Sequence, residues 1–507
     1  ITYTRAAAAE LRGKIAKVLG EKLQEDPLNA HLQRQLLRVY RADIKTVDAF
    51  CTALLRENCH LLREDARGHA LRPDFRVLDE NEAQVLRERV LARTLDDFYD
   101  CLTPGGTLLA DTLGAGRDDS ALEDLVLELH AKLQAQPYED KWLDAQRAFW
   151  RAVPDKIEDT PYGKILLNEV RRKARHCKNL LQRAAQEMCA NDALNQKYAP
   201  AFLDASYQLE ALEGKTAEGW DAARGVTIAF PRLAAVKDSD GGEMKARMKS
   251  LWDNCKETVK GFAEIFSASS DEAVEDLRTM ASAMLALIDL TADFSRRYNE
   301  EKRRRNSADF SDQEHEAIRL LIGEDGAPTE LARIVSARYR EIMVDEYQDT
   351  NEVQNRIFDA ISCKGENLFT VGDVKQSIYR FRLADPRIFL QHYNTWPSLE
   401  DAEEHDSAKL LLSRNFRSRK EVLDATNFIF CNILSEEMGE LDYGADEMLR
   451  LGANYVESSA CGAEFHLLDL PTQTGEQRVR ASEAEAAFVA DYISNMLTSE
   501  FPIQDDK

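Results

Sequence analysis

Two short apolar runs with a helical stretch between them constrain the fold of this chain more than any other feature. The runs are residues 342–344 and 368–371, and residues 352–361 between them have helical character. A strand, a helix and a second strand at this spacing form a βαβ unit, whose strands are parallel because the helix crosses back over the sheet. The sequence therefore predicts an α/β domain built on a parallel sheet.

Paired carboxylates follow the first of these strands. Asp345 and Glu346 open the segment Asp-Glu-Tyr-Gln-Asp-Thr at residues 345–350. Parallel sheets bind ligands at the carboxyl ends of their strands. There, one carboxylate can hold Mg²⁺ through water while its neighbour orients or deprotonates an attacking water. The alternative is an exposed Asp-Glu pair that only closes a strand.

The second strand leads into a glycine turn and then into alternating aromatic and basic residues. Residues 371–382 read Val-Gly-Asp-Val-Lys-Gln-Ser-Ile-Tyr-Arg-Phe-Arg, and Gln376 in this segment can reach a phosphate or the attacking water. Tyr379 and Phe381 can present rings to nucleic-acid bases, and such stacking contributes ~1–3 kcal/mol per base whatever the sequence. The alternative is that both rings belong to an ordinary core.

A basic segment stands out in an acidic chain. Residues 409–420 contain five basic residues and no acidic residue, whereas the whole chain has a net charge of −24. Arg417 could meet a γ-phosphate across a domain cleft, where an arginine accelerates hydrolysis by ~10³ or more; a solvated basic loop is the alternative. The acidic total argues weakly against nucleic acid as a partner, but phosphate contact depends on local Lys and Arg.

Composition bounds the remaining classes. The most apolar helical stretch, residues 280–288, ends at Asp289, well short of the ~18 apolar residues of a membrane span. The nine cysteines form no CxxC pair. This spacing disfavours a zinc or iron–sulfur site and is typical of a reducing, cytoplasmic setting.

The motifs resemble those of the UvrD/Rep branch of superfamily 1 DNA helicases. Residues 345–350, 372–382 and 415–418 resemble motifs II, III and IV of that family. Residues 2–11 resemble its TFTNAAAxEM segment, residues 46–51 its TIHSFC segment and residues 309–312 its DFxDL segment. Within the branch the chain is most similar to the AddA group, the helicase-nuclease subunits of complexes that process double-strand DNA ends for recombinational repair. RecB-like or stand-alone UvrD-like repair helicases remain alternatives, as does a catalytically inactive DNA-binding relative.

The resemblance implies a RecA-like P-loop NTPase motor with a parallel sheet, a large all-helical insertion and the start of a second RecA-like domain. Residues 1–58 with 306–400 would form the first motor domain, residues 59–305 the insertion and residues 401–507 the second domain. The implied activity is that of an ATP-dependent 3′–5′ helicase or translocase that uses ATP and Mg²⁺. Its implied partners are single-stranded DNA, duplex ends and an AddB-like subunit.

Roles for individual residues follow from the same resemblance. Asp345 would hold Mg²⁺, Glu346 would activate the attacking water, Gln376 would sense the γ-phosphate and Arg417 would stabilise its charge. The residues that would touch single-stranded DNA, or couple it to the ATP cleft, are Thr2, Tyr3, Arg5, Phe50, Tyr379, Phe381 and Arg382.

The sequence departs from the family pattern in three places. Asp48 stands where the family usually has His, and Phe381 where many relatives have Trp. No phosphate loop of the form GxxxxGK followed by Ser or Thr occurs. The family places that loop just before the segment at residues 2–4, so we expect it upstream of Ile1, and we expect the nuclease domain and the last helicase motifs beyond Lys507. This piece alone should therefore hydrolyse ATP poorly.

Local patterns give the remaining expectations. Ser311, with Glu314 three residues later, has capping-box spacing and predicts a helix start. Apolar runs predict strands at 410–412 and 463–470, and periodic segments predict helices at 420–434 and 481–497, together with a helix that carries Phe50, Leu54 and Leu55. The basic cluster within residues 296–305 either lines a DNA channel or forms a solvated helix face.

Overall fold

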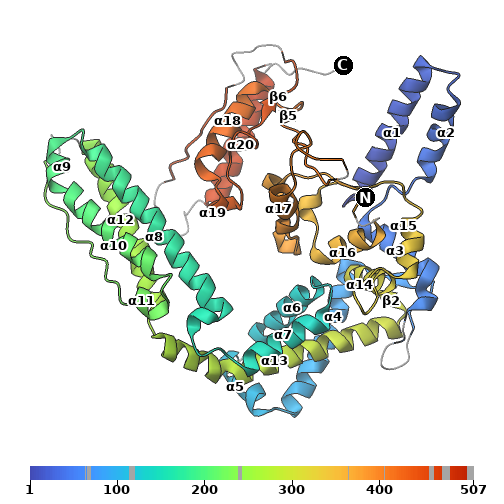
Figure 1. Cartoon of the computed structure of the whole chain (residues 1–507), viewed down its shortest axis with the longest axis horizontal. Helices are drawn as coiled ribbons and strands as arrows, with labels where there is room; N and C mark the ends of the chain where they lie inside the picture. The colour runs from blue at the N-terminus through green and yellow to red at the C-terminus, as the bar shows by residue number, and fades with distance from the viewer. Residues whose placement is uncertain are drawn as a thin grey trace. The chain divides into compact units, whose positions relative to one another are not determined.

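The computed structural model of the chain describes residues 1–62, 64, 70–113, 120–237, 242–362, 365–404, 406–455, 462–470 and 480–499. They divide into two units, residues 1–391 and residues 392–507, each of which is described by itself. Helices dominate the chain, and the strands of the described residues pair only in twos (Figure 1).

The parallel pair predicted from the two apolar runs is present in the first unit. β3 (Ile342–Val344) pairs in parallel with β4 (Leu368–Thr370), and α16 (Glu352–Ile361) connects them. On the other side of β3, the Ile1 nitrogen donates to the Met343 carbonyl at 2.6 Å, and the Asp345 N–H donates to the Ile1 carbonyl at 3.1 Å. Thr2 forms a parallel bridge with Thr46. Segments far apart in the sequence thus converge beside β3.

Helices cover one face of this pair. Ile342 and Val344 are buried in a core that they share with α3 (Val47–Asn58), α14 (Phe310–Leu321), α15 (Glu330–Ser336) and α16. The alternate residues Met343 and Phe369 are each 56% exposed, because successive strand residues point to opposite faces. The same core includes Phe75 and Ala308, so it is built from both sides of the long helical segment between them.

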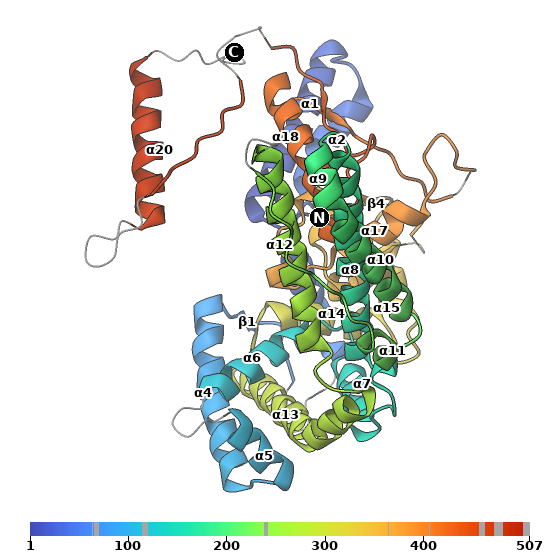
Figure 2. The ribbon, with the colours of Figure 1, turned by 90° about the vertical axis from the view of Figure 1, so that its left-hand side faces the viewer.

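That helical segment has cores of its own. β1 (Arg76–Val77) and β2 (Ser307–Ala308) pair in parallel at the two ends of the segment. One group of helices comprises α4 (Glu80–Asp100), α5 (Pro104–Leu113), α6 (Ser120–Gln134), α7 (Glu139–Arg151) and α13 (Ser270–Arg304). The other comprises α8 (Pro161–Met188), α9 (Asp192–Lys197), α10 (Ala199–Lys215), α11 (Trp220–Arg224) and α12 (Gly242–Ile265), in which α8 and α10 lie side by side (Figure 2).

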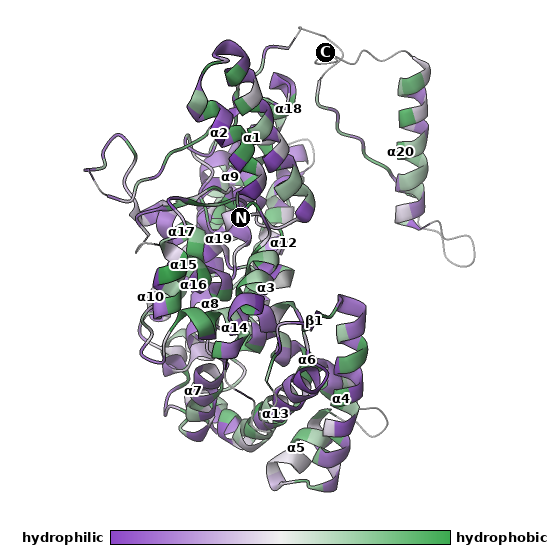
Figure 3. Cartoon of the chain, turned by 90° about the vertical axis from the view of Figure 1, so that its right-hand side faces the viewer, coloured by the Kyte–Doolittle hydropathy of each residue, from purple (hydrophilic) through white to green (hydrophobic). Residues whose placement is uncertain are grey.

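The long helix α13 links these cores to the core at β3. It contains 35 residues, which corresponds to ~52 Å of helix at ~1.5 Å per residue. Val274 lies in the core of α8–α12, Phe294 lies in the core of α4–α6, and Lys302 in the last turn is buried. Hydrophilic and hydrophobic residues share these helices (Figure 3), as expected for helices that each bury one face.

The remaining elements lie at the start and end of the chain. α1 (Arg5–Glu25) and α2 (Ala30–Arg38) pack side by side (Figure 1). α17 (Pro386–Thr395) spans the boundary of the two units. The second unit contains α18 (Lys420–Ile433), α19 (Glu436–Gly439), α20 (Ala481–Thr498) and the parallel pair β5 (Arg414–Asn415) and β6 (Arg450–Leu451).

The structure confirms some of the local predictions and corrects others. α18 and α20 confirm the helices expected at 420–434 and 481–497. The capping box of α14 is Asp309 with Asp312, not Ser311 with Glu314, since Asp caps a helix as well as Ser does.

Residues 410–412 and 463–470 are not strands. The strand contacts near the first run fall at Lys409, which bridges to Ser398, and at β5. Residues 463–470 pair with no strand in the described part of the chain, and Phe465 is 90% exposed. An apolar run becomes a strand only where a neighbour completes its hydrogen bonds.

Candidate functional site

The two carboxylates predicted to carry chemistry lie at the carboxyl end of β3. Asp345 is half-buried and Glu346 is exposed. Asp345 Oδ1 accepts a hydrogen bond from the Glu346 N–H at 3.1 Å, and the Asp345 N–H is held by the Ile1 carbonyl. The backbone on both sides therefore fixes Asp345 at the sheet edge where parallel folds bind ligands.

Glu346 has a left-handed backbone, with φ 52° and ψ 42°. Side chains other than glycine rarely adopt this conformation because Cβ approaches the backbone. Such residues cost of order ~1–3 kcal/mol and collect at functional sites. The strained residue lies between β3 and the short helical turn η5 (Tyr347–Asp349), so the turn itself indicates a site.

Gln348 joins the loop after β3 to the loop after β4. Its Nε2 donates to Glu346 Oε2 at 2.8 Å, and its Oε1 accepts from the Asp373 N–H at 2.9 Å. A Cβ on Gly372 would lie 2.5 Å from Gln348 Oε1 and 3.1 Å from the Tyr347 nitrogen, so the loops can approach only because residue 372 is glycine. Sequence reasoning found the glycine turn but missed Gln348.

Gln376 lies in the loop after β4, where its side chain contacts Asp373. Gln376 Nε2 donates to Asp373 Oδ2 at 2.9 Å, and Lys375 Nζ lies 2.8 Å from Asp373 Oδ1. Gln348 links this loop to Glu346 through the Asp373 N–H. The structure therefore brings the loop of Gln376 next to the carboxylates while Asp373 holds the Gln376 amide.

Asp349 is a polar group of the site that sequence reasoning also missed. Burial and the neighbouring Glu346 raise its pKa to about 6. Its Oδ1 is buried without a hydrogen-bond partner among the described residues. An unsatisfied buried polar group costs ~1–3 kcal/mol, and perturbed titratable groups gather at functional sites. The available signal was the second acid of the Asp-Glu-Tyr-Gln-Asp-Thr segment.

A cleft of about 910 Å³ opens in the same unit. Its wall is formed by Tyr3, Arg5, Thr46, Asp48, Ala49, Thr52, Ala53, Arg56, Arg76, Val77, Leu78, Asp79 and Phe310. The Tyr3 hydroxyl lies 2.7 Å from Thr350 Oγ1, so the wall of the cleft touches the loop that follows β3.

Four helices begin at this cleft, namely α1, α3, α4 and α14. Helix N-termini carry partial positive charge and N–H groups that bind phosphate. Arg5 and Arg56 add positive charge to the wall, while Asp48 and Asp79 oppose it. Burial raises the pKa of Asp48, which reduces its tendency to carry charge. The cleft therefore has a mixed polar wall with helix ends that favour an anion.

The residues expected to touch DNA fall into two groups. Tyr3 and Arg5 line the cleft, but Thr2 and Phe50 are buried. Phe50 packs in the core beside β3, and Thr2 Oγ1 donates to the Thr4 carbonyl at 3.1 Å. Solvent barely reaches either side chain. Burial favours the second role predicted for Thr2 and Phe50, coupling DNA to the ATP cleft, over direct contact, and both roles stay predictions.

The aromatic pair after β4 lies at the surface. Tyr379 is 38% exposed and Phe381 is 75% exposed, with ring centroids 5.9 Å apart. This exposure excludes the alternative that both rings are core residues. The backbone of Arg382 closes the turn η7 (Arg380–Arg382), but its side chain lies outside the described part of the structure.

Arg417 belongs to the second unit. Asn415 Oδ1 shapes its loop by accepting from the N–H groups of Arg417 at 2.9 Å and Ser418 at 2.8 Å. The Arg417 side chain is exposed. Its place beside the carboxylates of the first unit stays a prediction.

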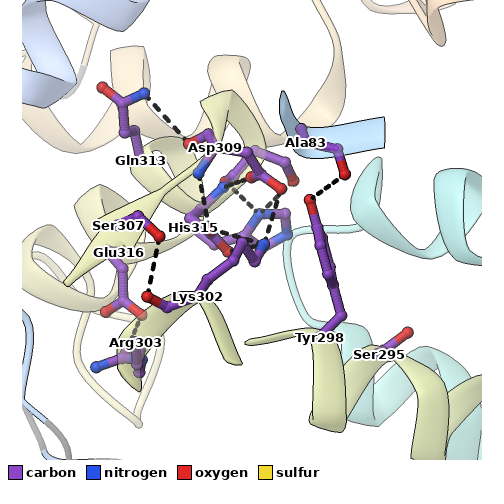
Figure 4. A network of polar contacts seen from close by, with 12 residues as sticks. Ala83, Ser295, Tyr298, Lys302, Arg303, Ser307, Asp309, Gln313, His315 and Glu316 are labelled. Atoms are coloured by element: carbon purple, nitrogen blue, oxygen red, sulfur yellow. Dashed lines mark hydrogen bonds and ion pairs between the residues drawn. The ribbon is translucent and has the colours of Figure 1, made fainter. Parts of the chain in front are cut away.

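The basic cluster at the end of α13 is held by ion pairs. Lys302 is 1% exposed, and its Nζ lies 2.8 Å from Asp309, 2.7 Å from Asp312 and 4.0 Å from the centre of the Tyr298 ring (Figure 4). The other pairs are Arg296 with Asp293 and Glu300, Arg297 with Asp97 and Asp293, Arg303 with Glu316, and Arg304 and Arg305 with Glu301. The buried part of the cluster therefore fastens α13 to α14, and the exposed part is a solvated helix face.

Of the helices that the structure describes, none combines the length and apolar character that a bilayer crossing demands. Within the same residues, no group of three or more His, Cys, Asp or Glu is placed to hold a metal ion by itself.

Comparison with known proteins gives consistent matches. Residues 1–397 match the UvrD/REP helicase N-terminal domain. Three relatives are each described as the A subunit of an ATP-dependent helicase/nuclease: that of Ruminiclostridium cellulolyticum is 33% identical over 96% of this chain, that of Acetivibrio thermocellus 35% over 96%, and that of Listeria innocua 32% over 100%. The chain spans 40%, 40% and 42% of the length of these three proteins.

Proposed function

The chain belongs to the UvrD/REP helicase family, and from this premise we propose that its first unit is the ATP-hydrolysing motor of a DNA helicase or translocase. The observation that carries the proposal is the position of Asp345 and Glu346 at the carboxyl end of β3, with Gln348 holding the loop after β4 beside them. This arrangement supplies a carboxylate for a metal ion and a second carboxylate for water at one sheet edge.

The proposed full-length protein is a 3′–5′ helicase of the AddA kind. It works with an AddB-like subunit on duplex DNA ends in recombinational repair, and its nuclease activity lies outside residues 1–507. The support is the description that the relatives share, which names both a helicase and a nuclease.

The proposed domain division follows the sequence expectation. Residues 1–58 and 306–400 form a RecA-like motor, residues 59–305 form a helical insertion, and residues 401–507 begin a second RecA-like domain. The support for the first two parts is the core at β3, which takes residues from both sides of the helical segment, and the separate cores of that segment.

The acidic residues at β3 fit a magnesium ion that arrives with a nucleotide. Mg²⁺ keeps several waters and takes one or two protein carboxylates together with substrate phosphates, instead of a protein cage. Asp345 offers one half-buried carboxylate, in keeping with that pattern. When bound, the ion neutralises phosphate charge.

The chain's own residues then perform the remaining steps. Glu346, oriented by Gln348 Nε2 at 2.8 Å, takes the proton of the attacking water. Gln348 also connects Glu346 with the loop that carries Gln376, so a change at the phosphate can reach both loops. Arg417 stabilises the developing charge from the second unit.

The proposed DNA path runs over the cleft and the exposed aromatic pair. Tyr3 and Arg5 line the cleft at the start of α1, and Tyr379 and Phe381 present exposed rings. Stacking on rings and contacts with the phosphate backbone show little sequence preference. The proposed motor therefore accepts DNA of any sequence.

The test is Glu346→Gln in the full-length protein, with DNA-stimulated ATP hydrolysis and DNA affinity as readouts. Loss of a general base costs ~10²–10⁴ in rate, so we expect hydrolysis to fall at least ~100-fold while DNA affinity is retained. Glu352→Gln is the matched control, because Glu352 lies on α16 in an ion pair with Arg356. Unchanged hydrolysis in Glu346→Gln would refute the assignment.

A second measurement concerns residues 1–507 alone. The sequence contains no GxxxxGK loop followed by Ser or Thr, so we expect little DNA-stimulated ATPase activity from the isolated piece. Robust activity would show that phosphate binding in this protein does not need that loop.

A further inference from the structure

A chain of polar contacts runs from the cleft to the loop of the two carboxylates. Tyr3 lines the cleft, and its hydroxyl lies 2.7 Å from Thr350 Oγ1 and 3.4 Å from Gln354 Oε1. Gln354 Nε2 donates to Glu314 Oε1 at 2.7 Å. Neither Gln354 nor Glu314 was singled out by its sequence pattern as part of a site.

We propose that the Gln354–Glu314 pair is a positioning element that passes occupancy of the cleft at Tyr3 on to Thr350, and so to the loop that carries Asp345 and Glu346. The inference rests on the proposed function, because the signal it carries is the stimulation of ATP hydrolysis by DNA.

Glu314 sets the direction of the hydrogen bonds in this chain. When Glu314 is ionised, its carboxylate only accepts hydrogen bonds. It then takes the NH₂ group of Gln354 and turns the amide oxygen toward Tyr3. The Tyr3 hydroxyl donates to that oxygen, and the Thr350 hydroxyl in turn donates to Tyr3. Without an acceptor at residue 314, the amide of Gln354 loses its preferred orientation and Tyr3 loses a defined acceptor.

Thr350 is the point at which the site loop is held. It is fully buried and follows η5. Its carbonyl accepts from the Asp385 N–H at 3.0 Å, just beyond the exposed aromatic pair. Tyr3 therefore pulls on the side chain of Thr350, while Asp385 holds the Thr350 carbonyl. A shift of Tyr3 then moves the segment between Glu346 and Thr350.

Glu314 also faces the other wall of the cleft. Burial and the carboxylate of Asp48, a cleft residue on α3, raise the pKa of Glu314 to about 7. The adjacent residue Gln313 accepts a hydrogen bond from Thr52, which also lines the cleft. α14 thus contacts the cleft residue Thr52 through Gln313 and contacts Gln354 of α16 through Glu314.

The cost of this arrangement argues for a role beyond packing. A buried carboxylate without a cation is unfavourable, and its hydrogen-bond partner Gln354 is neutral. An apolar side chain would fill the same space without that penalty. Sequences break such local rules mainly at functional sites.

The experiment compares Glu314→Leu with Glu314→Gln in the full-length protein. Glutamine keeps an acceptor for Gln354 Nε2, and leucine does not. The readouts are kcat with and without saturating single-stranded DNA, DNA affinity, and hydrogen exchange of residues 346–351 on DNA binding. Glu158→Leu is the matched control, because Glu158 is a partly buried carboxyl that accepts a hydrogen bond from the neutral Ser270 hydroxyl and lies outside this chain of contacts.

We expect Glu314→Leu to lower the ratio of DNA-stimulated to basal kcat at least tenfold, to change DNA affinity less than threefold and to abolish the DNA-dependent protection of residues 346–351. Glu314→Gln should keep at least half of the stimulation. Gln354→Met should repeat the effect of Glu314→Leu, and it serves as the second variant if Glu314→Leu folds poorly.

The outcomes separate this inference from the proposed function. A wild-type protein without DNA-stimulated hydrolysis overturns the proposed function and this inference together. A stimulated wild type with equal stimulation in Glu314→Leu and Gln354→Met overturns this inference alone. Equal loss in Glu314→Gln and Glu314→Leu, matched by equal loss of thermal stability, also overturns it, because the role would then be structural.

Discussion

The buried lysine at the end of α13 offers the sharpest test of the packing described above. Lys302→Met removes the charge but keeps an unbranched side chain of similar length. The change leaves Asp309, which is buried, and Asp312, which is half-buried, side by side without their cation. Removing one partner of a buried ion pair costs ~3–5 kcal/mol, because an uncompensated charge stays in the interior.

The matched control is Lys132→Met. Lys132 forms an ion pair with Glu128 at 2.7 Å, which equals the Lys302–Asp312 distance, but its side chain is 56% exposed. Exposed pairs contribute ~0–1 kcal/mol. Thermal unfolding of the two variants, followed by circular dichroism, should show a fall in melting temperature several times larger for Lys302→Met.

The pH dependence has a defined sign. Burial and Asp309 raise the pKa of Asp312 to about 6, and Lys302 opposes that rise while it holds the pKa of Asp309 low against burial. Without Lys302 both pKa values rise above those of the unfolded chain, so the folded state of the variant binds extra protons. The destabilisation should therefore be fully present at pH 8 and shrink at pH 5.

A compensating variant separates charge from packing. Lys302→Met with Asp309→Asn and Asp312→Asn replaces the ion pairs with neutral groups, which is often close to neutral for stability. Asn also serves as an N-cap, so the start of α14 is preserved. If Lys302→Met at pH 8 were no less stable than Lys132→Met, the reasoning that the buried pairs fasten α13 to α14 would be refuted.

Three further predictions follow from single sites. The pKa of Glu314 is about 7 in the fold and ~4.3 in the unfolded chain, so folding stability is lost as the pH rises between these values. Glu314→Gln removes this loss and should raise the melting temperature more at pH 8 than at pH 5. The difference in the free energy of unfolding between the two pH values is up to ~3 kcal/mol, at ~1.4 kcal/mol per pKa unit. Gly372→Ala places a Cβ 2.5 Å from Gln348 Oε1 and should lower DNA-stimulated ATPase activity at least tenfold, whereas Gly261→Ala, with nothing within 4 Å, should not. Phe381→Ala should weaken single-stranded DNA binding in fluorescence anisotropy by ~5–150-fold, from ~1–3 kcal/mol of stacking, and Phe381→Trp should not; equal affinities would remove Phe381 from the DNA path.

The sequence was sufficient for the elements whose residues specify them locally. The apolar runs at β3 and β4 and the intervening helix predicted a parallel pair, and the structure has it. The positions of Asp345 and Glu346 at the strand end follow from the same pattern. Gln348 and Asp349 could not be assigned in this way, because their roles depend on Gly372 and Glu346, contacts that no local period encodes.

Phe50 shows how two kinds of sequence reasoning can disagree. Its spacing with Leu54 and Leu55 predicts an apolar helix face, while its place in the resemblance to TIHSFC suggests contact with DNA. In the structure all three side chains are buried in the core at β3. The helical spacing of apolar residues indicates burial directly, because one face of a helix packs into the core. A family motif is less direct, because it contains residues that touch a ligand and also residues that only hold those residues in place.

The acidic composition has a similar explanation in α14. Its acids Asp312, Glu314 and Glu316 add to the net charge of −24, yet each has a different partner inside the fold: Lys302, the amide of Gln354, and the arginines at 303 and 319. One end of α14 is therefore tied to α13, and its middle is tied to Gln354 in α16, the helix that follows the loop after β3. Total charge cannot reveal this, because a sum treats a buried, paired carboxylate and a solvated one alike, and only the paired ones connect the parts of the molecule. A single helix that contacts both α13 and α16 through charged or polar side chains is a physical route by which a change at one could reach the other.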